Sequence, residues 1–218
     1  VLPKSEEWKK LYNNIAKHIS RPFNIKNLVK LDVLSLLKPI TCRLRIAESE
    51  FLSTSLFYRA LFGLTIAQPQ DLIDPYGLIV SRTATSSDKR IRLPFNMSRS
   101  GHASTERFRQ NHGGSGVQHI AIHCSDILNY IRSVDQSIVL PIPQNYYDDL
   151  EARFDLKPEL ADQLRKYNLL YDQNQTGHFI HFYTKPVNGL FLEVVQRHQY
   201  GNYGEANAHV RMGAQARL

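Results

Sequence analysis

The chain has 218 residues, of which 42% are hydrophobic, and its 27 Lys and Arg against 20 Asp and Glu give a net charge of +7. This length suits one large domain or two small fused modules with a sizeable core. No apolar run approaches membrane-spanning length, no signal peptide is evident, and no zinc-ligand spacing or RNA-binding motif accompanies the basic charge. We therefore expect neither a membrane nor a nucleic acid as partner. A small anionic substrate would account for part of the positive charge.

The two cysteines, Cys42 and Cys124, give no disulfide framework in a chain of this length. Such sparse cysteine usage is typical of a reducing compartment, so we expect a cytoplasmic protein with buried free thiols. The chain begins with Val1 rather than Met, from which we expect a fragment of a longer protein.

Residues 1–38 are predicted to form a helical arm. Trp8 and Leu11 lie along one side of an amphipathic helix, and a second helical run over residues 25–37 ends before Pro39. We interpret this segment as a packing arm or linker remnant rather than a functional element.

A first module is predicted over residues 39–116. Its opening strand alternates from Ile40 to Ala47, and one face of this strand carries three polar side chains: Thr41, Arg43 and Arg45. A helix from Glu50 to Leu61 follows and is stopped by Gly63. The segments DPYGLIVSRTA and KRIRLPFN supply further strands, and the last closes at Asn96. The stretch from Met97 to Gly116 is rich in Ser, Arg, Gly and His and is predicted to be a loop, with His112 exposed to solvent.

A second module is predicted over residues 117–218 and begins with the sequence GVQHIAIHCSDI. A period of two places His119 and His123 on one face of a strand, with Gln118 on the other face pointing outward. Ser125 and Asp126 then supply a helix N-cap. A histidine on a strand that leads into a helix can hold a metal on a rigid element, although a lone histidine is more often part of a core.

Two later strands complete this module after a helical insertion, whose helices are expected over residues 146–154 and 158–167. In LFLEVVQR, Glu193 shares a face with Phe191 and Val195, and a buried carboxylate among apolar side chains needs a cation, a metal or a raised pKa. In HFIHFYTK, strand parity directs His181 toward Glu193. One imidazole, His119, and one carboxylate would be two thirds of a two-His-one-carboxylate iron(II) face.

The sequence repeats its plan weakly. Residues 41–49 line up with residues 119–127, each as an alternating strand leading into a helix, and RIRLPFN lines up loosely with FLEVVQR.

Several motifs occur in the same order as in a known family. GVQHIAIHCSDI, IPQNYYDDLEARFDL, LLYDQN, GHFIHFYTKPVNGLFLEVVQR and YGEANAHVR together resemble the catalytic half of 4-hydroxyphenylpyruvate dioxygenase, of the vicinal-oxygen-chelate superfamily, over roughly residues 40–211. YYDDLEARFDL, His181 and the closing YGEANAHVR more specifically resemble the C-terminal, dioxygenase-like half of bacterial 3-dehydroshikimate dehydratases. Those proteins are fusions with an N-terminal sugar-phosphate-isomerase-like barrel. True hydroxyphenylpyruvate dioxygenases typically carry a tail nearer GFGxGNF, and Gln at the place of His181.

The resemblance implies an α+β fold of two tandem β-α-β-β-β modules around a shared metal cavity. It also implies a divalent metal, with Fe(II) favoured over Mn, Co or Mg, and the ligands His119 and Glu193. An ungapped alignment puts Thr41 where the family has its first histidine ligand, so that ligand is missing. The substrate-binding or accessory candidates are His181, Thr41, His123 and Asn96. Arg43 and Arg45 would repel a divalent ion but suit an anionic ligand.

Three functions remain open from the sequence. The first is the metal-binding, dioxygenase-like domain of a 3-dehydroshikimate dehydratase-type protein, serving quinate and shikimate catabolism toward protocatechuate and fused to a barrel domain. The second is a self-sufficient Fe(II) dioxygenase acting on a 2-oxo acid such as 4-hydroxyphenylpyruvate. The third is a degenerate, non-catalytic scaffold or ligand-binding module. The substrate class expected for either enzyme is a small 2-oxo or hydroaromatic acid, and a homodimer is expected from symmetry statistics.

Overall fold

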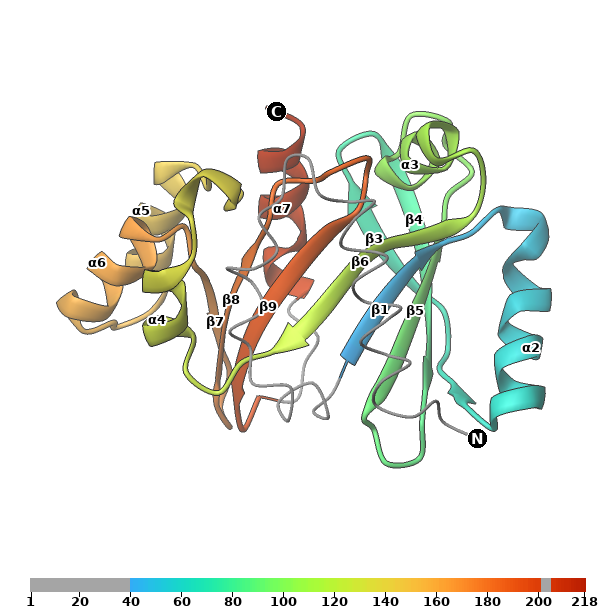
Figure 1. The fold of residues 1–218 in the computed structure, drawn as a ribbon, viewed down its shortest axis with the longest axis horizontal. Coiled ribbons are helices and arrows are strands. Elements are labelled where there is room, and N and C mark those ends of the chain that lie inside the picture. Colours follow the sequence, from blue (N-terminus) through green and yellow to red (C-terminus); the bar gives the residue numbers. More distant parts are fainter. Residues whose placement is uncertain (1–39, 201–204) are drawn as a thin grey trace, which may run out of the picture.

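The computed structural model describes residues 40–200 and 205–218 (Figure 1). The helical arm expected over residues 1–38 lies outside the described residues and stays a prediction. In the described part of the chain, no helix is long and apolar enough to cross a membrane.

Within the described ranges, nine strands form one mixed sheet with the path β2-β4-β5-β1-β6-β9-β8-β7, and β3 pairs with β4 off this path. The strands of the first half are β1 (Ile40–Arg45), β2 (Thr65–Ile66), β3 (Gln70–Asp74), β4 (Gly77–Thr85) and β5 (Ile91–Met97). Those of the second half are β6 (Gly116–His123), β7 (Leu170–Gln173), β8 (His178–Tyr183) and β9 (Phe191–His198). The helices are α2 (Phe51–Phe62), α3 (Ser104–His112), α4 (Ile127–Tyr130), α5 (Gln144–Arg153), α6 (Pro158–Lys166) and α7 (Ala208–Gln215).

The two halves of the sheet have the same connectivity. In each half the first strand pairs parallel with the last, β1 with β5 and β6 with β9, while the two first strands pair antiparallel with each other. Each half is thus a β-α-β-β-β module, and the first one carries the short extra strand β2. This arrangement confirms the predicted α+β fold class and the loose alignment of RIRLPFN with FLEVVQR, which form β5 and β9. The boundaries predicted near residues 38 and 116 stay predictions.

Helices cover the outer face of each module and leave the opposite face of the sheet for a cavity. In the first module α2 packs on β4 and β5 through a small core that includes Phe51, Ala84 and Phe95. In the second module a larger core, which includes Ile127 and Leu150, lies between α4–α6 and the strands β7–β9. Figure 1 shows α2 and the group of α4, α5 and α6 at opposite ends of the molecule, with α7 between them.

Residue types that favour helix ends occur where three of the helices begin or end. Gly63 ends α2 in the left-handed conformation, with φ of 64°, which glycine adopts without a Cβ penalty. The side chain of Asp126 accepts a hydrogen bond from the backbone N–H of Asn129 at 3.1 Å and caps α4, as predicted. Pro158 stands in the first turn of α6, where its missing N–H costs nothing.

The prediction of a loop from Met97 to Gly116 was wrong, because this stretch contains α3. Thr105 and Phe108, three residues apart, form one buried face that packs on the sheet, and Gly113 ends the helix with φ of 78°. Tertiary burial of these two side chains outweighs the polar composition that suggested a loop. His112 is exposed, as predicted.

The cysteines are free, as predicted. Cys124 is buried and Cys42 is half-buried, and burial raises the pKa of the Cys42 thiol.

Candidate functional site

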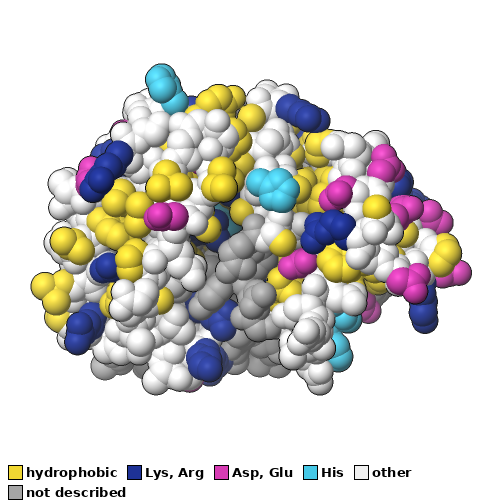
Figure 2. Space-filling model, turned by 180° about the vertical axis from the view of Figure 1, so that it is seen from behind, with side chains coloured by type: hydrophobic (Ala, Val, Ile, Leu, Met, Phe, Trp, Pro, Cys, Tyr) yellow, Lys and Arg dark blue, Asp and Glu magenta, His cyan; other side chains and the backbone are white. Residues whose placement is uncertain are grey.

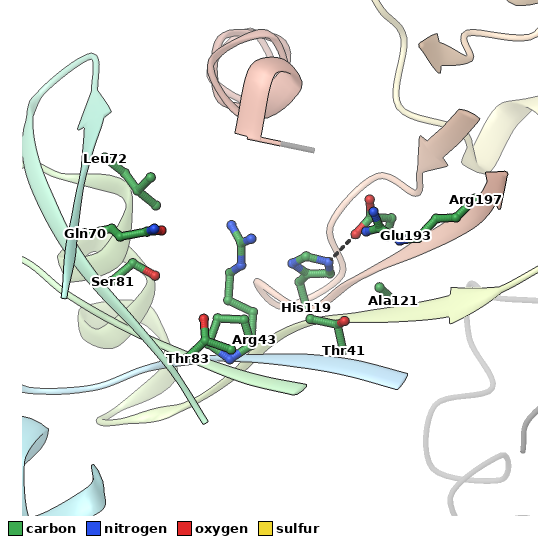
Figure 3. Close-up of a pocket in the computed structure, with 11 residues that line it drawn as sticks. Thr41, Arg43, Gln70, Leu72, Ser81, Thr83, His119, Ala121, Glu193 and Arg197 are labelled. Carbon is green, nitrogen blue, oxygen red and sulfur yellow. Dashed lines mark hydrogen bonds and ion pairs between the residues drawn. The ribbon is translucent and has the colours of Figure 1, made fainter. Parts of the chain in front are cut away.

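A cavity opens on the inner face of the sheet and is lined by residues of β1, β3, β4, β5, β6 and β9. It contains about 530 Å³ of space not filled by atoms, part of it open to solvent. Figure 3 shows Thr41 and Arg43 rising from β1, His119 from β6 and Glu193 from β9 into this region. The alternation of each strand explains this placement, because residues two apart share a face.

The centre of the site is a buried, hydrogen-bonded triad of His119, Glu193 and His181, which lie on three neighbouring strands. Nε2 of His119 lies 2.8 Å from Oε2 of Glu193, and Nδ1 of His181 lies 2.7 Å from Oε1 of the same carboxylate. His119 is 2% exposed, His181 0% and Glu193 7%. The strand parity that directed His181 toward Glu193 is therefore confirmed.

The electrostatics of the triad favour an ionised carboxylate between two neutral imidazoles. Burial by itself would raise the pKa of Glu193, but the hydrogen bonds from His119 and His181 hold it well below its usual value. Burial lowers the pKa of His119 to about 4, although its hydrogen bond to Glu193 acts in the opposite direction. Burial likewise lowers the pKa of His181. Each imidazole therefore donates an N–H to one carboxylate oxygen.

A second layer of hydrogen bonds fixes the orientation of His181. Nδ2 of Asn207 donates to Nε2 of His181 at 3.1 Å, which leaves the His181 proton on Nδ1. The Tyr146 hydroxyl lies 3.1 Å from Oδ1 of Asn207 and 3.0 Å from the carbonyl oxygen of Tyr171. This network joins α5, β7 and the C-terminal segment behind the site.

Asn207 and Tyr146 were missed as supporting residues by the sequence reasoning. Both stand in segments that carry the family resemblance, YGEANAHVR and IPQNYYDDLEARFDL, and this was the available signal.

Arg45 and Gln118 do not lie where strand alternation placed them. The pairing of β1 with β6 shifts register between Arg43 and Leu44, and beyond this irregularity Arg45 is 1% exposed and does not line the cavity. The Arg45 guanidinium instead donates to the side chains of Gln118 and Thr105. Gln118 is buried rather than outward-pointing, because it accepts from Arg45.

The remaining candidates divide between the cavity and its surroundings. Thr41 lines the cavity beside Arg43. His123 shares a strand with His119 but is not among the lining residues, since it lies four residues further along β6. Asn96 is fully buried, and with its amide oxygen turned toward Arg45 it accepts from Nη1 at 3.2 Å.

Two further arginines lie close to the triad of His119, Glu193 and His181. Arg197 lines the cavity from β9, with its guanidinium carbon 4.3 Å from the centre of the Phe179 ring. Arg211 of α7 was missed by the sequence reasoning and is 2% exposed. Its guanidinium lies over the rings of Phe191 and Tyr183, at 5.3 and 5.7 Å, which brings α7 onto the inner face of the sheet.

The residues present do not fit a three-ligand iron(II) centre. Among the described residues, no group of three or more His, Cys, Asp or Glu side chains is placed to hold a metal ion. Nδ1 of His119 is buried and has no hydrogen-bond partner in this part of the chain, whereas a metal-bound imidazole normally donates its second N–H. Arg43 is the cross-strand neighbour of His119, and its charge repels a cation. Metal ligation by His119 and Glu193 stays a prediction.

Comparison with known proteins shows similarity to parts of two kinds of enzyme. The chain is 42% identical over 166 residues to 3-dehydroshikimate dehydratase of Pseudomonas aeruginosa, a match that covers 74% of this chain and 26% of that protein. It is 31% identical over 145 residues to 4-hydroxyphenylpyruvate dioxygenase of Caenorhabditis briggsae, covering 61% of this chain and 37% of that protein. The chain thus spans about a quarter of the length of the 3-dehydroshikimate dehydratases that it matches. No protein-family model matches.

Solved structures show the same fold. A xylose isomerase-like TIM barrel/4-hydroxyphenylpyruvate dioxygenase fusion protein matches 82% of this chain and 29% of its own, with a TM-score of 0.67 and 36% identity. A variant of 4-hydroxymandelate synthase from Streptomyces coelicolor matches 84% of this chain and 54% of its own, with a TM-score of 0.72. At 23% identity the second likeness concerns the fold alone.

Proposed function

Because the chain is related to the dioxygenase-like proteins of the vicinal-oxygen-chelate superfamily, we propose that it is the dioxygenase-like domain of a 3-dehydroshikimate dehydratase-type protein. The observation that carries this proposal is the 42% identity over 166 residues to the Pseudomonas aeruginosa dehydratase. The likeness to a barrel–dioxygenase fusion protein, at 36% identity, supports the same assignment.

In this proposal the domain is a ligand-binding and assembly module, and the lyase reaction belongs to a covalently attached barrel domain. That reaction removes water from 3-dehydroshikimate and yields protocatechuate, as the last step of a quinate and shikimate route. The arrangement of Glu193 supports the division of labour, since both its oxygens already accept hydrogen bonds from His119 and His181. A carboxylate held in this way is ionised and is not available as a general acid.

A second candidate is an Fe(II)-dependent oxygenase of 2-oxo acids, and one observation favours it. Nε2 of His119 and the carboxylate of Glu193 meet beside the cavity, and these are the two ligand types that such a site needs. Thr41, which cannot replace an imidazole as a ligand, and the charge of Arg43 both count against this function.

The decisive experiment compares two chains and two substrates. We expect a fusion of this domain with its barrel to form protocatechuate from 3-dehydroshikimate, and the present chain alone to form none. We also expect the chain, incubated with Fe(II) and 4-hydroxyphenylpyruvate, to consume no oxygen above a Glu193→Gln control. Oxygen uptake that the control lacks would establish the oxygenase instead, and a fusion without dehydratase activity would contradict the first proposal.

A further inference from the structure

We propose that the guanidinium of Arg43 binds a small organic carboxylate in the cavity, without a metal ion. This inference rests on the proposed function, because it assigns the ligand of the same domain.

The first observation is an excess of positive charge around the inner face. Arg43, Arg45 and Arg211 lie near enough to one another that burial and then their mutual repulsion lower the pKa of Arg45. Among the residues that the structure describes, no carboxylate lies within ion-pair distance of any of the three. Arg45 donates to neutral oxygens of Gln118 and Thr105, and Arg211 donates to the amide oxygen of Gln215.

The two nearby carboxylates are already engaged elsewhere. Glu193 accepts from two imidazoles. Asp74, which is 4% exposed, accepts from the backbone N–H groups of Tyr76 and Ser104. Neither carboxylate therefore balances the arginines by direct contact, and desolvated positive charge without a counterion is costly. A bound anion would remove this cost.

The second observation is the position of Arg43 itself. Its side chain extends from β1 into the open space between Leu72 and His119 (Figure 3). Its Nε atom is buried and has no hydrogen-bond partner among the described residues, unlike the guanidinium of Arg45. A planar guanidinium with free donors matches a carboxylate through two parallel hydrogen bonds.

The third observation is the lining of the cavity opposite Arg43. Gln70, Ser81 and Thr83 offer an amide and two hydroxyl groups, while Leu72 and Pro94 supply apolar wall. This mixture of hydrogen-bonding groups and apolar wall suits a small carboxylate that carries polar substituents.

The distribution of surface acids agrees with anion entry at this face. Most of the Asp and Glu side chains seen in Figure 2 lie at the end of the molecule that α5 and α6 form, and a few lie elsewhere on this face. The helix α5 carries the exposed Asp148, Asp149 and Glu151, and Arg165 of α6 pairs with Asp148 and Glu151. These exposed acids are thus remote from Arg43, whereas Glu193, which lines the same cavity, is held by its hydrogen bonds to His119 and His181.

Isothermal titration calorimetry tests this proposal with two matched probes, benzoate and its uncharged analogue benzamide. We expect the full chain to bind benzoate with and without a chelator and to bind benzamide about tenfold more weakly or not at all, since a hydrogen bond to a charged group is worth more than one to a neutral group. Arg43→Gln should weaken benzoate binding about tenfold or more, and Arg43→Lys should weaken it less. Arg132→Gln is the control, because it removes the same charge from an exposed position outside the cavity.

Several results would overturn the inference. Equal affinity of the wild-type chain for the two probes would do so without any variant, as would unchanged benzoate binding in a folded Arg43→Gln chain. Benzoate binding that appears only after Fe(II) or Mn(II) is added would assign the ligand to a metal instead. Loss of dehydratase activity in the barrel fusion would contradict the proposed function but leave this calorimetric result unchanged, so the two failures are distinguishable.

Discussion

Acid should destabilise this protein through His119, and replacement by Gln should remove that effect. Burial lowers the pKa of His119 from 6.5 to about 4 in the folded chain. Between these two pH values the unfolded chain binds a proton at His119 and the folded chain does not. Stability therefore falls as the pH is lowered through this window.

The size of the effect follows from the two pKa values. The difference between 6.5 and about 4 corresponds to about 3 kcal/mol at about 1.36 kcal/mol per pH unit. His181 acts in the same direction because burial also lowers its pKa, and so does Glu193 below the usual carboxylate range. The prediction thus concerns the difference between the wild-type chain and His119→Gln, which keeps an N–H donor for Glu193.

Urea unfolding followed by far-ultraviolet circular dichroism, at pH values from about 8 to about 4, measures this difference. We expect the wild-type chain to lose about 3 kcal/mol more than His119→Gln between the two ends of the series. The control is His102→Gln, which replaces an exposed histidine and should follow the wild-type curve. If the free energy of unfolding varied with pH in the same way for the wild type and His119→Gln, the protonation states assigned to the triad would be refuted.

Three other substitutions test the site and the fold. Glu193→Gln should cost about 2 kcal/mol in urea unfolding, because an NH2 group then replaces one of the two oxygens that accept from the buried imidazoles. A chelator that destabilises the wild type but not this variant would instead reveal a bound metal. Gly177→Ala should cost about 1–3 kcal/mol in the same assay, because its Cβ would overlap the carbonyl oxygen of His198, and an unchanged stability would contradict that close approach. Asp126→Ala should cost about 1 kcal/mol through loss of the α4 cap, and a neutral effect would show that the cap bond contributes nothing.

The faces on which Thr41, His119, His181 and Glu193 lie could be predicted from the sequence, whereas those of Arg45 and Gln118 could not. Within a single strand the backbone alone fixes alternation, so the parity of His119, His181 and Glu193 followed from their positions. The end of α2 at Gly63 and the start of α4 at Asp126 were also indicated by these residue types. The repeated strand–helix pattern and the ordered motifs indicated two modules of the same topology.

Tertiary structure decided which of these side chains meet and what surrounds them. A register shift in the pairing of β1 with β6 accompanies the burial of Arg45 away from the cavity, and pairing irregularities depend on two strands at once. The helix α3 depends on the burial of Thr105 and Phe108, which no local pattern revealed. Arg211 and Asn207 reach the site from the C-terminal end of the chain because α7 and the turn before it pack against Tyr183 and His181 of β8. Alternation within a strand is a local property of the backbone, whereas the charge and hydrogen bonding of a cavity are sums over elements that only folding brings together.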